Sequence, residues 1–400
     1  MIALLCLGIW LYLLVAHGRY WQSGPELDPS LPPVHPDVDI VVPARDEAQT
    51  IAPVIASLLA QDYRGTFRVL LVDDDSTDDT AAAAGTAPNL TIITGQPKPD
   101  GWSGKLWALA QGVAASRAPI LLFTDADIIH DPRHLSTLVA RLLQSHADQA
   151  DATLPHADQT APSQPGTIQH RVGPPRTELV SEMVRLNCSS LAERALVPAF
   201  VYFFQMLYPF SKVNDPSSPV AAAAGGTILI RRETLQRVGG IESIRGALID
   251  DVTLARVIKP HGALYLGHSG LATSIRSYPR FADIWRMIAR TAFTQLRYSA
   301  VLLALAVTGL ALVWLGPLAQ VLLHRDWRFA CGLIAFALGA MTYVPTLARF
   351  RLSYVWSLLL PAVAAFYMAA TVGSALGHWF GRGARWKSRA YGDGRKAPPP

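Results

Sequence analysis

Cysteine and charged side chains are both scarce in this sequence of 400 residues. Its three cysteines, Cys6, Cys188 and Cys331, have spacings that fit neither a disulfide framework nor a zinc site. Charged residues make up only 16% of the chain, against 50% hydrophobic residues and a mean hydropathy of +0.24. An ordinary soluble domain is less apolar than this. The composition therefore disfavours both a disulfide-stapled domain and an ordinary soluble one.

The excess of apolar residues is concentrated in four stretches without a charged side chain, which are residues 1–16, 301–323, 329–348 and 353–377. The last three reach the roughly 20 residues that a helix needs to cross a bilayer. The first extends to residue 21, where Tyr20 and Trp21 would be interfacial anchors. Because it lacks a basic leading segment and a cleavage site, we expect an uncleaved transmembrane anchor over 1–21. About three more helices are expected in a C-terminal membrane region, 299–378.

Basic side chains gather in the C-terminal tail, 379–400, which contains "RGARWKSRAYGDGRK". We expect a disordered tail held at the membrane surface, since no base-reading module suggests a nucleic acid as partner. With one anchor, three C-terminal spans and the region between them in the cytoplasm, this tail would lie outside, against the positive-inside tendency. Three explanations stay open: a re-entrant apolar segment, a further span at 196–212, or an exception to the rule.

Between the membrane segments, apolar strands alternate with helices. After a Pro-rich linker at 22–37, the predicted strands lie within 38–44, 67–76, 90–95 and 119–127, and the predicted helices are 47–61, 77–85 and 105–116. Short, wholly apolar strands alternating with helices are typical of an α/β fold, with a mostly parallel sheet covered on both faces. We therefore expect one α/β domain over 38–298.

The later part of this domain is less regular. Residues 146–176 are polar and predict a flexible insertion. Residues 191–210 are apolar and aromatic but hold two prolines, which favours a core or interfacial helix over a membrane span. Residues 221–240 predict a loop, a strand and a helix, and 248–262 predict a helix opened by two carboxylates.

Polar clusters follow three of the predicted strands, at 43–47, 73–75 and 125–127. Ligands of parallel sheets bind at the carboxyl ends of the strands. Three clusters that converge on one edge indicate a binding site more strongly than any one of them alone.

Asp125 and Asp127 stand one residue apart after a buried strand, where unpaired carboxylates would cost stability. Their oxygens suit Mg²⁺ or Mn²⁺, with the remaining coordination positions left for waters and phosphates. The alternative is that Asp127 or Asp131 only caps the helix near Pro132.

Three consecutive acids, Asp73, Asp74 and Asp75, end the second predicted strand. An EF-hand is excluded because its glycine and closing glutamate are missing at the required offsets. Helix capping by Ser76 or Asp78 leaves the three preceding acids unexplained. A carboxylate at a strand end can accept a hydrogen bond from a base or a ribose.

The stretch "GWSGK" at 101–105 is not a Walker A loop, because Pro99 and Leu106 stand where that motif requires glycine and Ser or Thr. Lys105 could still lie near a phosphate at a helix N-terminus, or be a solvated lysine after a turn. Asp250 and Asp251 either favour a helix dipole or place a general base beside an acceptor hydroxyl.

A basic amphipathic helix is expected over 280–298. Helical spacing puts Arg286, Arg290 and Arg297 on one face. Such a helix just before a membrane span can anchor the protein at the membrane surface, deliver an arginine to a diphosphate, or do both.

These motifs together resemble family 2 glycosyltransferases with the GT-A fold. "VVPARDEA", "LVDDDSTDDT", "GWSGK", "TDAD", "AAAAGGTILI" and "IDD" occur in that family's order, over roughly residues 38–300. More narrowly, "GWSGKLWAL", "LVPAFVYFFQMLYPF" and "RMIARTAFTQLRYS" are similar to the bacterial hopene-associated glycosyltransferases, and ceramide glucosyltransferases are more distant relatives. The resemblance implies a nucleotide-sugar donor, usually UDP-linked, a divalent metal, and inversion at the anomeric carbon.

The resemblance also assigns roles to single residues. It places along the donor nucleotide Ala44, Asp46, Glu47, Asp73 or Asp74, Lys105 and Asp125. Asp127 would bind the metal, and Asp251, beside Asp250, would be the catalytic base. The Q-x-x-R-W motif of processive synthases is imperfect, since "QLRY" ends in tyrosine, which argues against a polysaccharide synthase. The resemblance suggests four candidates for contacts with the diphosphate or the acceptor, which are Arg286, Arg290, Gln295 and Arg297.

The sequence thus predicts a metal-dependent, inverting glycosyltransferase of the inner membrane, with its catalytic domain in the cytoplasm and a lipid as acceptor. A hopanoid acceptor follows from the resemblance only. The alternatives are another lipid, such as a polyprenyl phosphate or a sphingolipid-like alcohol, and a catalytically idle nucleotide-binding component of a lipid pathway.

Overall fold

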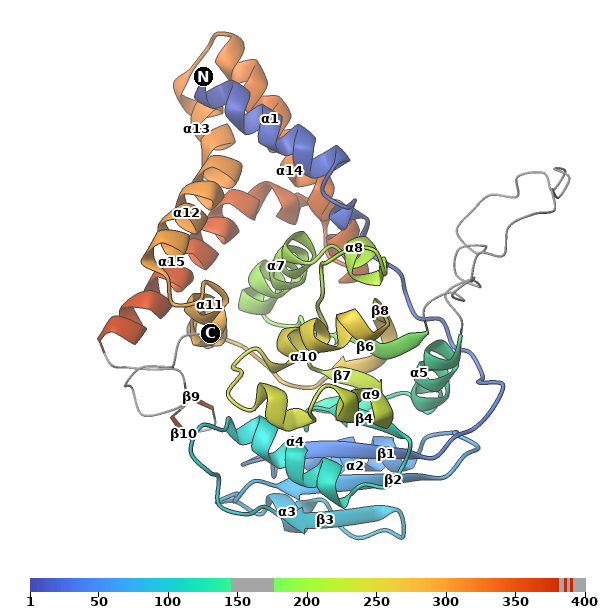
Figure 1. The fold of residues 1–400 in the computed structure, drawn as a ribbon. Helices are drawn as coiled ribbons and strands as arrows, with labels where there is room; N and C mark the ends of the chain where they lie inside the picture. The colour runs from blue at the N-terminus through green and yellow to red at the C-terminus, as the bar shows by residue number, and fades with distance from the viewer. Residues whose placement is uncertain (145–175, 381–384, 387–388, 391–400) are drawn as a thin grey trace, which may run out of the picture.

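A computed structural model describes residues 1–144 and 176–380, together with two short paired strands, β9 (Arg385–Trp386) and β10 (Arg389–Ala390). Figure 1 shows a sheet with flanking helices below and a group of long helices above, with the N-terminus at its far tip. Residues 145–175 lie outside the described residues, so the predicted insertion at 146–176 does too, apart from Arg176. Of the predicted tail at 379–400, Trp379 is still helical and most other residues lie outside the description.

Eight strands form one mixed sheet in the order β3-β2-β1-β4-β7-β6-β8-β5. The pairs β2–β3, β1–β2, β1–β4 and β6–β8 are parallel, whereas β4–β7, β6–β7 and β5–β8 are antiparallel. The strands are β1 Val38–Ala44, β2 Phe67–Asp73, β3 Leu90–Thr94, β4 Ile120–Thr124, β5 Ile128–His130, β6 Thr177–Arg185, β7 Thr227–Arg231 and β8 Ala263–Ser274.

Helices cover both faces of this sheet because its strands are apolar on both sides. Along β1, Val41 enters one core, whereas Ile40 and Val42 enter the other. The first core includes side chains of α4 (Gly104–Ala115) and α10 (Asp250–Ile258), and the second includes those of α2 (Ile51–Leu59) and α5 (His134–Leu143). Shorter helices are α3 (Thr80–Ala83), α8 (Phe210–Asn214), α9 (Arg232–Arg237), η2 (Ile241–Ile244) and η3 (Lys259–His261).

The α/β prediction is confirmed, and each strand and helix predicted between 38 and 127 is present with shifted ends. The strands β5, β6 and β8 were not predicted. The 12-residue β8 contains the polar and glycine-rich stretch Gly267–Gly270, and β6 carries Glu182 with no exposed surface. These polar and glycine residues interrupt the apolar pattern of the two strands, so hydrophobic periodicity does not predict either strand.

The upper part of the molecule holds three helical segments that are long and apolar enough to cross a membrane, judged by length and composition. The first is Ala300–Leu323, in which a π-turn joins α12 (Ala300–Leu310) to α13 (Gly316–Leu323). The second is α14 (Trp327–Arg349). The third is Tyr354–Trp379, in which a 3₁₀ turn, η5 (Tyr354–Leu359), leads into α15 (Leu360–Trp379). These segments agree with the membrane region predicted over 299–378.

The N-terminal helix is shorter than the span expected over 1–21. Helix α1 (Ile2–Val15) has 14 residues and a length of about 21 Å, less than the roughly 30 Å of a bilayer's hydrocarbon core. It ends because Gly18 and Arg19 take left-handed backbone conformations. Its Trp10 packs on Gly339 of α14, so α1 lies against the helical group rather than apart from it.

Helix α7 (Leu191–Leu207) is the apolar, aromatic segment for which a core or interfacial helix was favoured, and the structure buries much of it, including Leu196, Val201 and Tyr202. Its first turn is closed by a capping box between Ser190 and Glu193. The buried Tyr202 hydroxyl lies 3.0 Å from that of Tyr20 and 2.7 Å from Thr342 Oγ1 of α14. Helix α7 thereby joins the catalytic domain to the helical group, and it is not among the segments long enough to span.

Helix α15 runs alongside α11 (Phe281–Gln295), the helix predicted to be amphipathic, and in the same direction. Early in both helices, Phe366 packs edge-on against Trp285, with ring centroids 5.5 Å apart. Late in both helices, Phe293 packs against Trp379 at 5.4 Å. The end of α15 therefore lies beside the end of α11, where the chain enters α12.

Candidate active site

The three predicted polar clusters meet at one edge of the sheet. Strand register pairs Ala44, the last residue of β1, with Asp73, the last residue of β2. Strand β4 is parallel to β1 on its other side and ends at Thr124, directly before Asp125. The convergence expected from parallel strands is therefore present in the structure.

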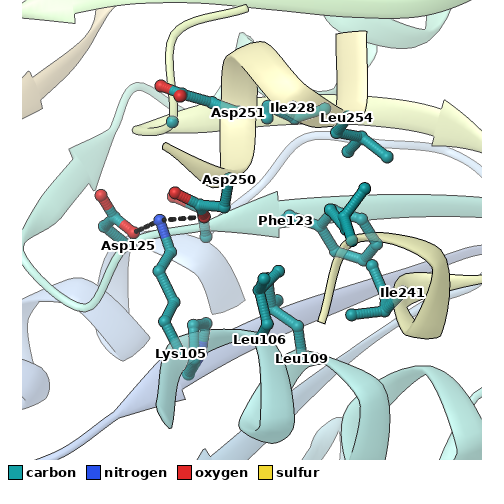
Figure 2. A pocket seen from close by; sticks show the side chains of 14 residues that line it. Lys105, Leu106, Leu109, Phe123, Asp125, Ile228, Ile241, Asp250, Asp251 and Leu254 are labelled. Atoms are coloured by element: carbon teal, nitrogen blue, oxygen red, sulfur yellow. Dashed lines mark ion pairs between the residues drawn. The ribbon is translucent and has the colours of Figure 1, made fainter. Parts of the chain in front are cut away.

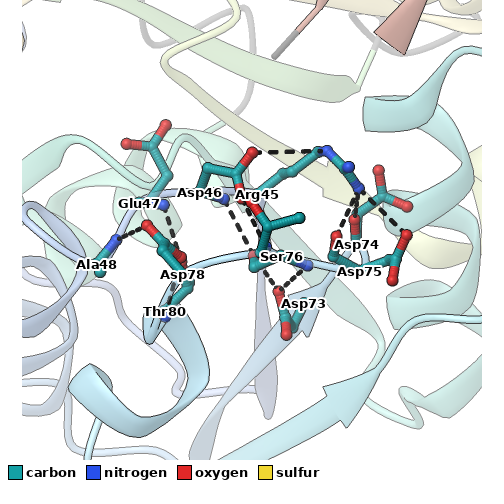
Figure 3. Close-up of polar contacts among 11 residues, drawn as sticks. Arg45, Asp46, Glu47, Ala48, Asp73, Asp74, Asp75, Ser76, Asp78 and Thr80 are labelled. Carbon is teal, nitrogen blue, oxygen red and sulfur yellow. Dashed lines mark hydrogen bonds and ion pairs between the residues drawn. The ribbon is translucent and has the colours of Figure 1, made fainter. Parts of the chain in front are cut away.

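The loops after β1 and β2 hold each other through polar contacts (Figure 3). Asp46 takes a left-handed conformation, and its Oδ1 accepts hydrogen bonds from the amide of Thr77 at 2.7 Å and its hydroxyl at 3.1 Å. The Glu47 amide donates to Thr80 Oγ1 at 2.8 Å. Arg45, for which no role was predicted, donates to the carbonyls after β2, including that of Asp75 at 2.7 Å.

The three acids after β2 differ sharply in accessibility. Asp74 has no exposed surface, whereas the side chain of Asp75 is 72% exposed. Asp73 is half-buried, and its Oδ1 accepts from the amide and the hydroxyl of Ser76. Of the two residues predicted to contact a base, Asp73 is thus the accessible one.

Lys105 lies at the centre of the site (Figure 2). It stands in the first turn of α4, which is capped by Ser103. Its Nζ lies 2.9 Å from Asp125 Oδ1 and 3.2 Å from Asp250 Oδ2. Burial alone would lower the pKa of Lys105, but the two carboxylates outweigh it and raise that pKa. The sequence left open whether Lys105 binds a phosphate or is a solvated side chain. In the structure it is ion-paired with Asp125 and Asp250.

Asp250 and Asp251 open helix α10 as predicted, but they point to different sides. In Figure 2, Asp250 faces Lys105 while the Asp251 carboxylate is directed away from it. Burial, followed by repulsion from Asp250, raises the pKa of Asp251 to about 7. A carboxyl group with such a pKa can exchange a proton near neutral pH.

Gly225 keeps the approach to this carboxylate open. A Cβ atom at Gly225 would lie 3.1 Å from Asp251 Oδ2 and 3.5 Å from Lys105 Nζ. The cavity lined by these residues measures only about 10 Å³, which is room for about one water. The ion pairs of Lys105 thus leave little free space at this point of the site.

Asp127, the predicted metal ligand, is held by an arginine for which no role was predicted. Arg276 Nε lies 2.5 Å from Asp127 Oδ2, and Arg276 Nη2 lies 2.6 Å from Glu47 Oε1. Burial opposes the charge of Arg276, but the two carboxylates outweigh burial and raise its pKa. The sequence signal was weak, because Arg276 follows the unpredicted strand β8 and belongs to no recognised motif.

The residues predicted for the acceptor side are only partly brought to the site. Arg290 is near enough to the site to affect Tyr278: burial raises the pKa of that phenol, and the charges of Arg276 and Arg290 oppose the rise. Arg286 instead pairs with Asp283 at 2.5 Å and is 68% exposed.

Gln295 and Arg297 complete this set. Gln295 donates to the hydroxyl of Tyr208, and its role on the diphosphate and acceptor side stays a prediction. Arg297 lies beyond the end of α11, in a left-handed conformation, so its predicted place on one helical face with Arg286 and Arg290 is wrong. The helix ends two residues too early for that spacing to apply.

A buried chain of polar contacts connects the last residue of β4, Thr124, to Glu182 of β6. Thr124 Oγ1 lies 3.1 Å from His130 Nε2, His130 Nδ1 lies 2.8 Å from His134 Nδ1, and His134 Nε2 lies 2.6 Å from Glu182 Oε2. Burial, followed by repulsion from His134, lowers the pKa of His130. This network was not predicted, because it joins residues of four separate elements.

The donor set of this site suits a divalent ion that gains further ligands from a bound phosphate or from water. The described parts of the chain hold no cluster of three or more His, Cys, Asp or Glu side chains arranged around a metal position. Mg²⁺ is commonly held by one or two carboxylates plus substrate phosphates. Asp125 and Asp127 can supply those carboxylates once Arg276 releases Asp127.

Comparison with known proteins identifies the family of this chain. The model of the family described as "Glycosyl transferase family 2" matches residues 39–239. A 4,4'-diaponeurosporenoate glycosyltransferase of Staphylococcus haemolyticus is 29% identical over 113 residues, which are 28% of this chain and 29% of that protein. A glucosyl-3-phosphoglycerate synthase of Mycolicibacterium paratuberculosis is 35% identical over 109 residues, 26% of this chain and 33% of that one. The match thus spans about a third of the length of these relatives.

Among solved structures, the mannosyltransferase PcManGT from Pyrobaculum calidifontis, in complex with GDP-Man and Mn²⁺, superposes over 93% of this chain and 99% of that chain. The TM-score is 0.49 and the sequence identity is 19%. The family match covers half of the sequence, from the first strand of the sheet to the turn after α9. With its GT-A-like mixed sheet and flanking helices, this chain belongs to glycosyl transferase family 2.

Proposed function

We propose that this protein is a membrane-associated, inverting glycosyltransferase that moves a sugar from a nucleoside diphosphate donor to a lipid acceptor. The observation that carries the proposal is the arrangement of Lys105 between Asp125 and Asp250, with Asp251 beside them, at the carboxyl edge of the sheet. Family membership supports the reaction class.

The donor nucleotide would lie over the ends of β1 and β2. Ala44, Asp46 and Glu47 line that edge, and the accessible Asp73 is better placed than the buried Asp74 to accept a hydrogen bond from a base. The family resemblance suggests uracil. The diphosphate would then lie near Lys105, Asp125 and the β4 end, where its charge is matched.

Asp127 would hold a divalent ion, Mg²⁺ or Mn²⁺, with Asp125 close by. When bound, the ion would neutralise charge on the leaving diphosphate. Arg276 bridges Asp127 and Glu47 and holds both carboxylates in place before a ligand arrives. Released from Asp127, this guanidinium would be free to pair with a phosphate oxygen, as arginine does bidentately.

In the transfer step, the acceptor hydroxyl oxygen forms a bond to the anomeric carbon. The bond from that carbon to the diphosphate oxygen breaks, and its electron pair leaves with the diphosphate. The Asp251 carboxylate takes the hydroxyl proton, for which its pKa of about 7 is suitable. Lys105 stays protonated and stabilises the departing charge. A single in-line displacement of this kind inverts the anomeric centre.

A lipid acceptor is supported by the helical group above the site, with its three apolar segments of membrane length. One relative is named for 4,4'-diaponeurosporenoate. A hopanoid is favoured among lipids only by the resemblance of motifs such as "GWSGKLWAL". A polyprenyl phosphate or a sphingolipid-like alcohol is the alternative acceptor. The alternative to an enzyme is a catalytically idle protein that binds the nucleotide but transfers no sugar.

For the membrane arrangement, we propose that the catalytic domain faces the cytoplasm and that α15 lies along the membrane surface. Helix α15 packs along the full length of α11, whose exposed Arg280 and Arg286 do not suit hydrocarbon. Two crossings, by α12–α13 and by α14, would then return the chain to its starting side. This is the re-entrant alternative, and it would place the basic tail inside, in line with the positive-inside tendency.

The reaction is tested with membranes that contain the full-length protein, Mn²⁺ and a panel of radiolabelled UDP-sugars, with and without added hopanoid. We expect label in the organic extract with the wild type and with Asp131→Asn, which removes a partly exposed carboxylate that pairs with Arg133. Asp251→Asn and Asp127→Asn should each lose it while remaining folded. An idle protein would give no label with any donor and would be indifferent to Asp251→Asn.

A further inference from the structure

A second cavity lies between the catalytic domain and the helical group. It is lined by the loop that joins β6 to α7, by the middle and end of β8, and by the end of α14. Its volume of about 280 Å³ far exceeds the space that one water needs. None of its lining residues lines the pocket at Lys105, so it is a separate site.

The charged side chains that line this cavity are all cations. Arg185 comes from the end of β6, Arg349 from the last position of α14, and Arg351 from the turn that follows. Burial, helped by the nearby Arg349, lowers the pKa of His268 to about 3, so this lining histidine is neutral. The cavity therefore carries positive charge without a carboxylate in its wall.

The positive charge is compensated only in part. Arg349 pairs with Glu26 at 3.3 Å and donates to Ser23 Oγ at 3.2 Å. Within residues 1–144 and 176–380, neither Arg185 nor Arg351 forms an ion pair with an acidic side chain. Like charges that share a cavity repel, so an anion bound between them would relieve the repulsion.

The position of the cavity indicates where such an anion comes from. The 23 residues of α14 form an apolar segment of membrane length that ends at Arg349. The chain turns there through the left-handed Arg351, and beyond the half-buried Leu352 the apolar side chains of Tyr354 and Val355 are 57% and 67% exposed. Cations at the end of an apolar helix, next to exposed apolar side chains, match a phospholipid that has a charged head and acyl tails.

We propose that this cavity binds the phosphate headgroup of an anionic phospholipid, with Arg185 and Arg351 as direct ligands and Arg349 as the charge behind them. Ser269, also in the lining, offers a hydroxyl to the same headgroup. The acyl chains would follow the apolar surface at the start of η5. The site is independent of sugar transfer, and its occupant would fix the catalytic domain against the membrane.

The test uses the full-length protein in neutral detergent, titrated with short-chain phosphatidylglycerol, short-chain phosphatidylcholine or inorganic phosphate. The retained lipid is counted by native mass spectrometry, and the unfolding midpoint is followed in parallel. We expect phosphatidylglycerol to bind and raise the midpoint, with phosphatidylcholine and phosphate far weaker. Arg351→Gln and Arg185→Gln should each weaken phosphatidylglycerol binding about tenfold, as loss of a charged hydrogen bond does.

Arg325→Gln is the matched control, because it removes the same charge from the exposed turn between α13 and α14. It should leave lipid binding unchanged. Equal binding of both lipids, or unchanged binding in Arg351→Gln and Arg185→Gln, would overturn the proposal. Inorganic phosphate as strong as phosphatidylglycerol would instead identify a site for free phosphate. The exposed Arg185 provides the test if Arg351→Gln fails to fold.

Discussion

The edge of the sheet and the helical group above it differ in what fixes their residues. At the sheet edge, strand register and ion pairs hold each side chain, as with Lys105 between Asp125 and Asp250. In the helical group, apolar side chains pack helix on helix, and most polar groups serve only to join the helices. Changes at the edge should therefore alter chemistry, metal binding or pH dependence, whereas changes among the helices should alter packing alone.

The largest expected effect is on transfer at the sheet edge. Asp251→Asn should lower the rate by about 10²- to 10⁴-fold, the usual contribution of a general base, with UDP binding retained. In the wild type, kcat/KM should fall about tenfold per pH unit below pH 7, since a carboxyl with a pKa of about 7 loses its basic form as pH decreases. The pH profile of transfer with one labelled donor measures this.

Lys105→Met sharpens the same prediction. Lys105 lowers the pKa of Asp251, against burial and Asp250, so removal of the ammonium should move the acidic limb to higher pH. A limb that stays in place would show that another group titrates. A pH-independent rate in the wild type would remove Asp251 from the role of base.

The sheet edge was also the part most open to sequence reasoning, and the reason is physical. An apolar strand followed by acids reveals both the strand and its end, so the pattern alone places Asp73, Asp125 and Asp127 at the edge of the sheet. The residues that pair with them leave no such pattern. Arg276 and Glu182 lie on elements whose partners are far away in sequence, and only the tertiary fold brings them to β4.

The helices pose the opposite problem, because apolar length predicts that a helix exists but not how deeply it lies. The stretch 1–21 had the composition of an anchor, yet its helix ends at Val15. Residues 353–377 were predicted to span, and the segment Tyr354–Trp379 is long and apolar enough to do so, although α15 also packs alongside the charged helix α11. How deeply a helix lies in the membrane depends on its packing against neighbouring helices, and hydropathy contains no information about that packing.

The second prediction concerns the stability of the fold at Asp39, near the start of β1 and so at the end of that strand away from the site. Asp39 is 1% exposed, and its carboxylate pairs with Arg68 at 2.8 Å and accepts from Ser116 Oγ at 2.6 Å. These contacts outweigh burial and lower its pKa from 3.8 to about 2. Asp39→Asn should therefore cost about 2 kcal/mol of unfolding free energy at neutral pH.

The sign of the pH dependence follows from that lowered pKa. The contribution of Asp39 is complete above the unfolded pKa of 3.8 and disappears as pH falls toward 2. Denaturant unfolding of the protein in detergent, at pH 7 and below pH 4, measures both values. Asp79→Asn, at an exposed carboxylate, is the control and should change little. Equal stability of Asp39→Asn and wild type at pH 7 would contradict the assignment.

A smaller effect is expected for metal binding. Arg276→Gln frees Asp127 and Glu47 from their shared cation, so Mn²⁺ should bind about tenfold more tightly in the absence of nucleotide. Titration of Mn²⁺ by electron paramagnetic resonance provides the measurement, independently of transfer. Arg280→Gln removes the same charge from a 74% exposed position and should have no effect. Unchanged or weaker binding in Arg276→Gln would mean that the metal does not use Asp127.

The last prediction concerns the helices, where Gly373 of α15 lies against Trp285 of α11. A Cβ atom there would lie 2.7 Å from Cζ2 of Trp285, whereas a Cβ at Gly377, one turn later, would meet nothing within 4 Å. Gly373→Ala should therefore lower the unfolding free energy by about 1–3 kcal/mol, and Gly377→Ala should be neutral or raise it by up to about 1 kcal/mol. Kinetics at the sheet edge should stay normal in both. If Gly373→Ala instead abolishes transfer in folded protein, α15 contributes to the site, and the separation between a chemical edge and a packing layer does not hold.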